Sequence, residues 1–258
     1  MPYLTRDGVK LYYDETGSGP AMVFIHGWCC NRTYFAPQYE HFSKLHRVIT
    51  VDLRGHGESD KPEGEYSLPV FADDVAWMLG EVGVTSAVVV GHSMGGSVAA
   101  ALAARHPQLV NAAIAVDSGI ISSEGFRQRS GPILEALRGP DYVAASRRMV
   151  EGMFKPEDSP VLKARILDEM SSAPQHVMAA CMQMNADTTA ESLGSIAQPL
   201  LMIAAGHFAF DPAPMREVAP KLRFAQTVGS GHFNQLEVPE QVNAMIERFL
   251  AIEMADGW

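Results

Sequence analysis

The chain has 258 residues, of which 47% are hydrophobic, and its formal net charge at pH 7 is −10. This length and composition fit a globular protein built as a single α/β domain with room for an inserted cap. The acidic balance, together with the lack of any basic cluster in the sequence, argues against nucleic acid and membrane surfaces as partners.

The N-terminal half alternates apolar strand patterns with helical ones. Residues 3–14 predict a β-hairpin with Asp7-Gly8 at its turn. Further strands are predicted at residues 21–25, 46–51, 87–90 and 110–116. Helices are predicted at residues 67–81 and 95–105. Strands that alternate with helices in this way indicate a mostly parallel sheet covered on both faces.

The alternation of strand and helix patterns stops in the middle of the chain. Residues 120–198 show no strong strand pattern, and their helical patterns are interrupted at Gly131-Pro132 and Gly139-Pro140. Strand patterns return at residues 200–204 and 222–228, and an amphipathic helix is predicted at residues 239–252.

This change from alternating strands and helices to helical patterns alone predicts two domains. Residues 1–118 and 198–258 form the α/β core, and residues 119–197 form a helical cap above the carboxyl ends of the strands. The cap is rich in methionine, a side chain that suits an adaptable apolar pocket, although methionines at helical spacing also serve as ordinary core.

The strand at residues 87–90 leads into Gly91–Gly95, whose sequence Gly-His-Ser-Met-Gly fits the pattern G-x-S-x-G. A strand that turns sharply into a helix strains the turn residue and projects its side chain from the top of the sheet. The glycines remove β-carbons that would clash in that turn. Ser93 is therefore predicted to be a nucleophile, with the Met94 N–H at the helix N-terminus as an oxyanion donor.

A serine hydroxyl needs a base, which is usually histidine. Of nine histidines, His232 follows the last predicted strand directly, in the glycine-rich stretch Gly229–Phe233. It would stand at the same edge of the sheet as Ser93, so we predict His232 as the base.

A second oxyanion donor is expected from the loop after the strand at residues 21–25. Gly27 permits close approach of the backbone, and the Trp28 N–H would face that of Met94. The alternative is that these residues form only a tight turn.

Four motifs together resemble those of the α/β-hydrolase superfamily. They are His26-Gly27-Trp28, Asp52-x-x-Gly55-x-Gly57-x-Ser59, Gly91–Gly96 and Gly231-His232-Phe233. The resemblance covers essentially the whole chain. It implies a central, mainly parallel eight-stranded sheet with helices on both faces, a Ser-acid-His triad and no cofactor.

The triad acid is open between two residues. In most members of the superfamily it stands three residues after a glycine that follows the strand at residues 200–204, but here Gly206 leads to Ala209. Asp211 comes two residues later, in a longer loop. In a subset of the superfamily the acid ends the preceding strand, where this chain has Asp117, and zearalenone-type lactone hydrolases look similar in this respect. We favour Asp117 because a strand would hold it rigidly at the edge of the sheet.

These residues predict a serine hydrolase for a small, largely apolar carboxylic ester or lactone, with no metal. A carbon–carbon bond hydrolase would share the constellation and add basic residues in the cap, for which Arg147, Arg148 and Arg165 are available. A ligand receptor on a hydrolase scaffold is a third interpretation, which an intact triad disfavours. The sequence does not identify the exact substrate. It also leaves the oligomeric state open, and a homo-oligomer is one of the possible states.

Cysteine usage favours a cytoplasmic protein. Cys29 and Cys30 are adjacent and Cys181 stands alone, so no disulfide framework is predicted. Residues 1–8 lack the apolar core of a signal peptide, and the apolar region at residues 87–104 is interrupted by the serine turn. Whether Cys29 and Cys30 line a pocket or are simply buried stays open at this point.

Overall fold

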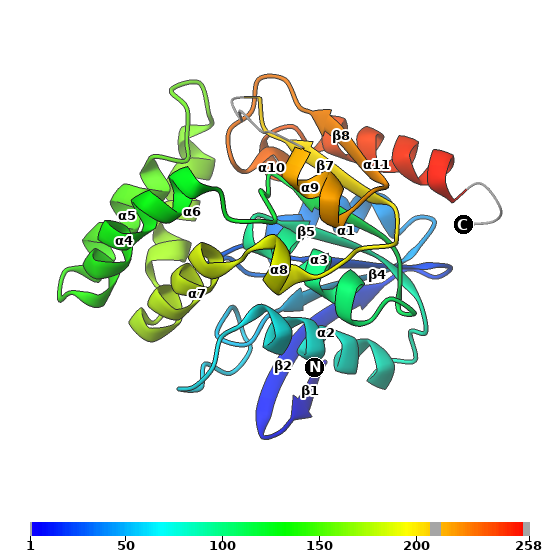
Figure 1. Ribbon diagram of the computed structural model, residues 1–258, viewed down its shortest axis with the longest axis horizontal. Coiled ribbons are helices and arrows are strands. Elements are labelled where there is room, and N and C mark those ends of the chain that lie inside the picture. The colour runs from blue at the N-terminus through cyan, green and yellow to red at the C-terminus, as the bar shows by residue number, and fades with distance from the viewer. Residues whose placement is uncertain (1, 207–212, 255–258) are drawn as a thin grey trace.

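An eight-stranded sheet runs through the computed structural model, which describes residues 2–206 and 213–254 (Figure 1). The strand order is β1-β2-β4-β3-β5-β6-β7-β8. The strands are β1 (Tyr3–Arg6), β2 (Val9–Thr16), β3 (Ala21–Ile25), β4 (Arg47–Asp52), β5 (Ala87–His92), β6 (Val110–Val116), β7 (Leu200–Ala204) and β8 (Leu222–Gln226). The pairs β1–β2 and β2–β4 are antiparallel, and the remaining pairs are parallel. The prediction of a mainly parallel eight-stranded sheet is confirmed.

Helices cover both faces of this sheet because its central strands are apolar on both sides. In β3, Val23 belongs to the apolar cluster that contains Phe71 of α2 (Leu68–Glu81) and Leu102 of α3 (Met94–Arg105). The neighbouring residue Phe24 points to the opposite face, as strand geometry requires. There it joins a second cluster with Phe42 of α1 (Ala36–Phe42) and Phe249 of α11 (Pro239–Glu253).

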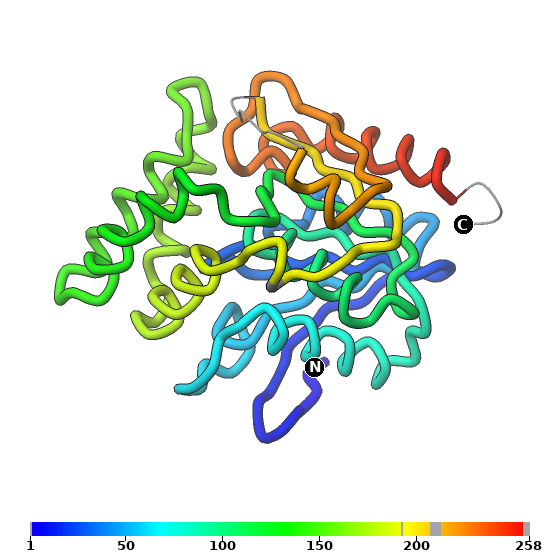
Figure 2. Tube along the Cα trace, viewed as in Figure 1, coloured from blue at the N-terminus to red at the C-terminus, as the bar shows by residue number. Residues whose placement is uncertain are grey.

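Five helices are inserted between β6 and β7, and the first four of them lie to one side of the sheet, whereas the last contacts α3 (Met94–Arg105) and α9 (Ala213–Val218) (Figure 2). They are α4 (Glu124–Arg138), α5 (Tyr142–Glu151), α6 (Pro160–Ser171), α7 (Gln175–Asp187) and α8 (Ala190–Leu193). We call them the helical insert. The division into a core of residues 1–118 and 198–258 and a cap of residues 119–197 stays a prediction.

The predicted interruption at Gly131-Pro132 is wrong, because α4 continues through both residues. Proline removes one backbone donor from the ladder, but α4 packs closely against α7 and begins with a Ser123 cap whose Oγ accepts from the Phe126 N–H, with an N···O distance of 3.1 Å. Tertiary packing therefore outweighs a local breaking signal. The second signal, at Gly139-Pro140, does end the helix.

Short elements account for most of the remaining differences from the sequence prediction. The strand predicted at residues 222–228 ends at Gln226, and the one predicted from residue 46 begins at Arg47. The sequence patterns did not reveal the 3-10 helix η1 (Arg32–Phe35) or the short helices α9 (Ala213–Val218) and α10 (Asn234–Glu237). Elements of four to six residues are too short to show a helical period.

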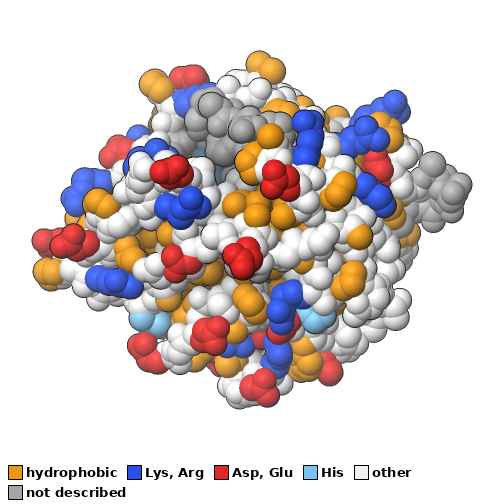
Figure 3. All heavy atoms as spheres, in the orientation of Figure 1, with side chains coloured by type: hydrophobic (Ala, Val, Ile, Leu, Met, Phe, Trp, Pro, Cys, Tyr) orange, Lys and Arg blue, Asp and Glu red, His pale blue; other side chains and the backbone are white. Residues whose placement is uncertain are grey.

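On the face shown in Figure 3, acidic and basic side chains are interspersed with apolar ones. Within residues 2–206 and 213–254, no helix is long and apolar enough to span a membrane. The cytoplasmic location stays a prediction.

Candidate active site

Ser93 stands at the junction of β5 and α3 in a strained backbone conformation, with φ 53° and ψ −120°. Backbone carbonyl groups approach Gly91 and Gly95 so closely that neither position can hold a β-carbon. A β-carbon on Gly91 would lie 1.9 Å from the carbonyl oxygen of Gly95, and one on Gly95 would lie 2.1 Å from that of Ile25. The sharp turn expected from G-x-S-x-G is therefore present. The backbone atoms packed against it leave no room for a side chain at Gly91 or Gly95.

This crowding gives a stability prediction. Gly91→Ala should lower the free energy of unfolding by about 3 kcal/mol, because the new methyl group overlaps backbone atoms that belong to another element. Gly80→Ala in α2 is the matched control, since its β-carbon would meet nothing within 4 Å and it lies in a helix. That variant should be neutral or stabilised by about 0.5–1 kcal/mol. Urea unfolding of both variants measures the difference, and equal midpoints would contradict the packing argument.

The structure brings Ser93, His232 and Asp117 together in one hydrogen-bonded chain. The His232 Nε2 lies 3.0 Å from the Ser93 Oγ, and its Nδ1 lies 2.6 Å from the Asp117 Oδ2. The carboxylate can only accept, so Nδ1 carries the proton and Nε2 is free to accept one from the hydroxyl. The Asp117 side chain is 2% exposed and that of His232 is 19% exposed. A polar chain this well shielded from water is suited to proton transfer.

Asp117 directly follows β6 and has a positive φ of 41°. Its Oδ1 accepts a hydrogen bond from the Ala205 N–H, with an N···O distance of 2.7 Å. Burial opposes ionisation of this carboxyl, but the hydrogen bond and charge of His232 and the Ala205 N–H lower its pKa below the ordinary value. The alternative acid, Asp211, lies outside the described residues.

The two predicted oxyanion donors belong to elements that meet at Ser93. Met94 is the first residue of α3, so its N–H has no acceptor within the helix. The loop after β3 lies directly against the serine, because a β-carbon on Gly27 would be 3.2 Å from the Ser93 β-carbon. The next residue, Trp28, anchors that loop to the insert, since its indole N–H donates to the Met178 carbonyl oxygen at 3.0 Å.

His26 holds the same loop from the other side. Its Nε2 accepts from the Leu53 N–H at 3.1 Å, so the proton sits on Nδ1, which donates to the Gly27 carbonyl oxygen at 2.8 Å. Burial, chiefly, lowers the pKa of His26 to about 4 and the pKa of His92 to about 3. Both rings are therefore neutral at pH 6 and above, and neither competes with His232 for a proton.

Cys29, Cys30 and Cys181 are free and buried. Burial raises the pKa of all three thiols above the ordinary value, so they stay protonated and unreactive at neutral pH. The Cys30 thiol donates to the Trp28 carbonyl oxygen, with an S···O distance of 3.3 Å. Cys29 and Cys30 are thus buried within the loop that follows β3, and Cys181 is buried in α7.

The arginines proposed for a carbon–carbon bond hydrolase are engaged elsewhere or exposed. Arg147 donates to the Asp168 carboxylate at 2.7 Å on the surface, and Arg148 is exposed. Arg165 has its guanidinium 5.9 Å from the centre of the Tyr34 ring and 3.8 Å from the Glu169 carboxylate. None of the three has a contact with Ser93 or His232 in the described part of the chain.

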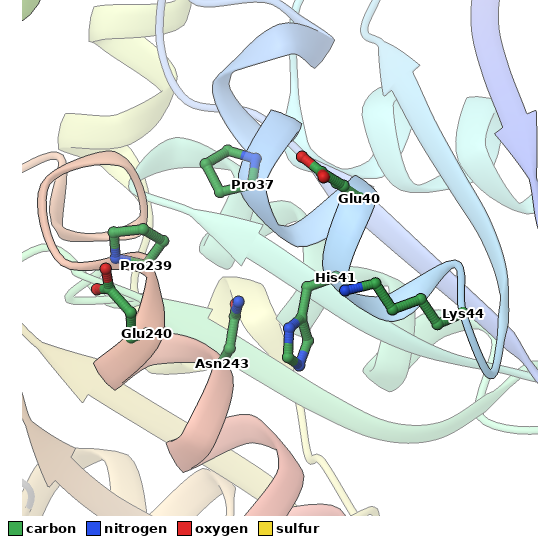
Figure 4. Close-up of a pocket in the computed structure, with 7 residues that line it drawn as sticks. All are labelled: Pro37, Glu40, His41, Lys44, Pro239, Glu240 and Asn243. Carbon is green, nitrogen blue, oxygen red and sulfur yellow. The ribbon is translucent and has the colours of Figure 1, made fainter.

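A separate surface pocket of about 220 Å³ lies between α1 and the start of α11 (Figure 4). Its lining includes His41 from α1, Lys44 from the turn after α1, and Asn243 from α11. None of the predicted site residues lines it, so it is distinct from the chain of hydrogen bonds at Ser93.

Sequence reasoning missed Glu237, which accepts hydrogen bonds from the backbone on both sides of His232. The relevant signal is a carboxylate five residues after the histidine, and this spacing becomes informative only once the short helix α10 is known. It also missed the role of His92, whose Nε2 donates to the His232 carbonyl oxygen at 2.8 Å.

Comparisons with known proteins identify the family and the fold. A family model described as alpha/beta hydrolase fold matches residues 20–139. The chain is 32% identical to Est816, described as an N-acyl homoserine lactone degrading enzyme, with a TM-score of 0.85 over 96% of this chain and 100% of that one. It is 26% identical to a thermophilic esterase from Thermogutta terrifontis, with a TM-score of 0.80 over 96% of each chain.

Among curated proteins, a 2-(acetamidomethylene)succinate hydrolase of Mesorhizobium japonicum is 40% identical over 109 residues, or 42% of this chain. The match spans 39% of that relative, so the chain covers about two fifths of the length of curated relatives such as this one.

Proposed function

This chain belongs to the alpha/beta hydrolase family, and we propose that it is a serine hydrolase for a small, largely apolar carboxylic ester or lactone. The observation that carries the proposal is the buried chain of hydrogen bonds from Ser93 through His232 to Asp117. A chain with this order of groups activates a hydroxyl for attack on a carbonyl carbon.

In the proposed reaction the Ser93 Oγ attacks the substrate carbonyl while its proton passes to the His232 Nε2. The Asp117 carboxylate stabilises the resulting imidazolium, whose Nδ1–H it already accepts at 2.6 Å. The N–H groups of Trp28 and Met94 hold the oxyanion. His232 then protonates the leaving alkoxide, and the carbonyl re-forms as an acyl-enzyme.

Water completes the cycle. His232 takes a proton from the water as it attacks the acyl-enzyme, and returns that proton to the Ser93 Oγ as the acid product leaves. With a lactone, the leaving alcohol remains joined to the acyl chain, so one product is released. The helical insert is proposed to act as the cap over this site, since Trp28 contacts it through the Met178 carbonyl oxygen.

The substrate class is supported by the relatives as well as by chemistry. Est816, the 32%-identical structure, is described as degrading an N-acyl homoserine lactone, and the Thermogutta terrifontis protein is described as an esterase. Of the insert arginines, Arg147 pairs with Asp168 on the surface and Arg148 is exposed, which favours ester and lactone over the carbon–carbon substrates.

A substrate panel tests this proposal. We expect kcat/KM for short p-nitrophenyl esters or an N-acyl homoserine lactone to exceed that for a diketone carbon–carbon substrate by more than about tenfold, equivalent to about 1.4 kcal/mol in transition-state binding. The Ser93→Ala protein supplies the background rate. A preference for the diketone would assign the carbon–carbon reaction, and stoichiometric ligand binding without turnover would assign a receptor.

A further inference from the structure

One carboxylate fixes the loop that carries the candidate base. The Oε2 of Glu237 accepts a hydrogen bond from the Gly231 N–H, with an N···O distance of 2.6 Å, and its Oε1 accepts one from the Phe233 N–H at 3.1 Å. These donors flank His232, whose carbonyl oxygen is held by the His92 Nε2–H at 2.8 Å. Hydrogen bonds to Glu237 thus hold the backbone before and after His232, and the bond from His92 joins His232 to the turn that carries Ser93.

The helical insert reaches the same loop through the segment between α5 and α6 (Figure 1). The Met153 carbonyl oxygen accepts from the His232 N–H at 3.4 Å. The Phe154 ring stacks on that of Phe233, with ring centres 5.2 Å apart and planes tilted by 27°. The insert therefore contacts the residue that carries the base and the residue that follows it.

Two acids meet at this contact. The Asp158 carboxyl, from the insert, lies beside that of Glu237, because the point where a β-carbon on Gly231 would stand is 2.7 Å from the Asp158 Oδ2 and 3.2 Å from the Glu237 Oε1. The Asp158 Oδ2 also accepts from the Lys155 N–H at 2.6 Å. Two carboxyl groups at such a contact can be joined by a hydrogen bond only when they share a proton, because two carboxylates have only acceptors. Burial first, then the hydrogen bond and charge of Asp158, raise the pKa of Glu237 to about 7.

His232, Lys155, Lys163 and the exposed Glu157 are other titratable groups on the elements packed at this contact. His232 is on the same loop as the hydrogen-bond donors to Glu237. The Lys155 Nζ is 3.7 Å from the point where a β-carbon on Gly206 would stand, and the Lys163 Nζ is 6.0 Å from the centre of the Phe154 ring.

We propose that Glu237 is a positioning residue for His232 and that it shares a proton with Asp158, so that docking of residues 153–158 and placement of the base are coupled. The proposal rests on the proposed role of His232 as base. Glu237 acts through the backbone and does not touch the reacting atoms.

The direction of the pH effect follows from the shared proton. Glu237 has a higher pKa in the folded protein than in the unfolded chain, so its contribution to stability is complete in acid and is lost as pH rises through about 7. Above that pH, two carboxylates repel each other across the contact, and residues 153–158 separate from the loop.

Asp158→Asn is the sharpest variant, because it keeps an acceptor for the Lys155 N–H and gives Glu237 a donor that does not titrate. The kcat of this variant divided by the wild-type kcat should rise at least threefold between about pH 6 and pH 8.5, with a midpoint near 7, and pH effects common to both proteins cancel in the ratio. The matched control is Glu157→Gln, which removes the same charge from an exposed neighbouring side chain.

Glu237→Gln tests the positioning role itself. The glutamine has one acceptor for two backbone donors, so kcat should fall about tenfold and KM should change little, because the base is displaced while the substrate contacts stay. Glu237→Ala should lower kcat about 100-fold. A change confined to KM, or none, would overturn the positioning role.

The melting temperature gives a readout that does not depend on catalysis. Relative to Asp158→Asn, the wild-type melting temperature should fall as pH rises from 5.5 to 8.5, and Glu157→Gln should follow the wild type. Ratios and melting differences that do not vary with pH would refute the shared proton. Persistent activity in Ser93→Ala would instead refute the proposed function, so the two failures are distinguishable.

Discussion

Replacing Ser93 with alanine should lower kcat by about 10³-fold or more, because the proposed reaction has no other nucleophile. The fold should survive, since the side chain is only half-buried at the turn and its hydroxyl contacts His232 rather than the core. We expect the free energy of unfolding to change by less than about 1 kcal/mol. Residual turnover of an activated ester, measured against the uncatalysed rate, gives the size of the loss.

Ser97 provides the matched control for this variant. It lies one turn further along α3, and its Oγ donates to the Ile120 carbonyl oxygen at 3.0 Å. Ser97→Ala should therefore lose about 1 kcal/mol of stability and keep kcat within a few-fold of the wild type. A fluorophosphonate probe should label the wild type at Ser93 alone. Labelling at another residue, or full activity in Ser93→Ala, would remove Ser93 from the mechanism.

The positions of Ser93 and His232 could be predicted because each depends on local rules. The run of β-branched residues before Gly91 and the small residues after Gly95 define a strand and a helix, and only a glycine-flanked turn can join them this tightly. His232 needed one further step, that the carboxyl ends of parallel strands share one edge. Neither step requires knowledge of which strands are neighbours.

The acid could not be decided in that way. Asp117 stands at the end of β6, which is flanked by β5 and β7, and the insert separates β6 from β7 in sequence. Its contact with the Ala205 N–H thus depends on a long-range pairing that no local pattern reveals. Glu237 could not be identified from the sequence for a related reason. Its contacts depend on the short helix α10, which carries it, and on a segment of the insert that is distant in sequence.

Asp117→Asn should lower kcat by roughly 10²- to 10⁴-fold, because an amide imposes the wrong tautomer on the base. The variant can still accept from the Ala205 N–H through its carbonyl oxygen, which turns its NH₂ group toward the His232 Nδ1. To accept from that NH₂, Nδ1 must lose its proton. The proton then sits on Nε2, which faces the Ser93 Oγ as a donor and cannot take the serine proton.

The same measurement on Asp211→Asn decides between the two acids. We expect that variant to lose less than about tenfold in kcat, as befits a residue without a role in fixing the tautomer. Both proteins should be compared on one activated ester, after circular dichroism and urea unfolding show that each is folded. If Asp211→Asn loses the larger factor, the acid is Asp211, and the hydrogen bond from His232 to Asp117 holds the base without stabilising its charge in the reaction.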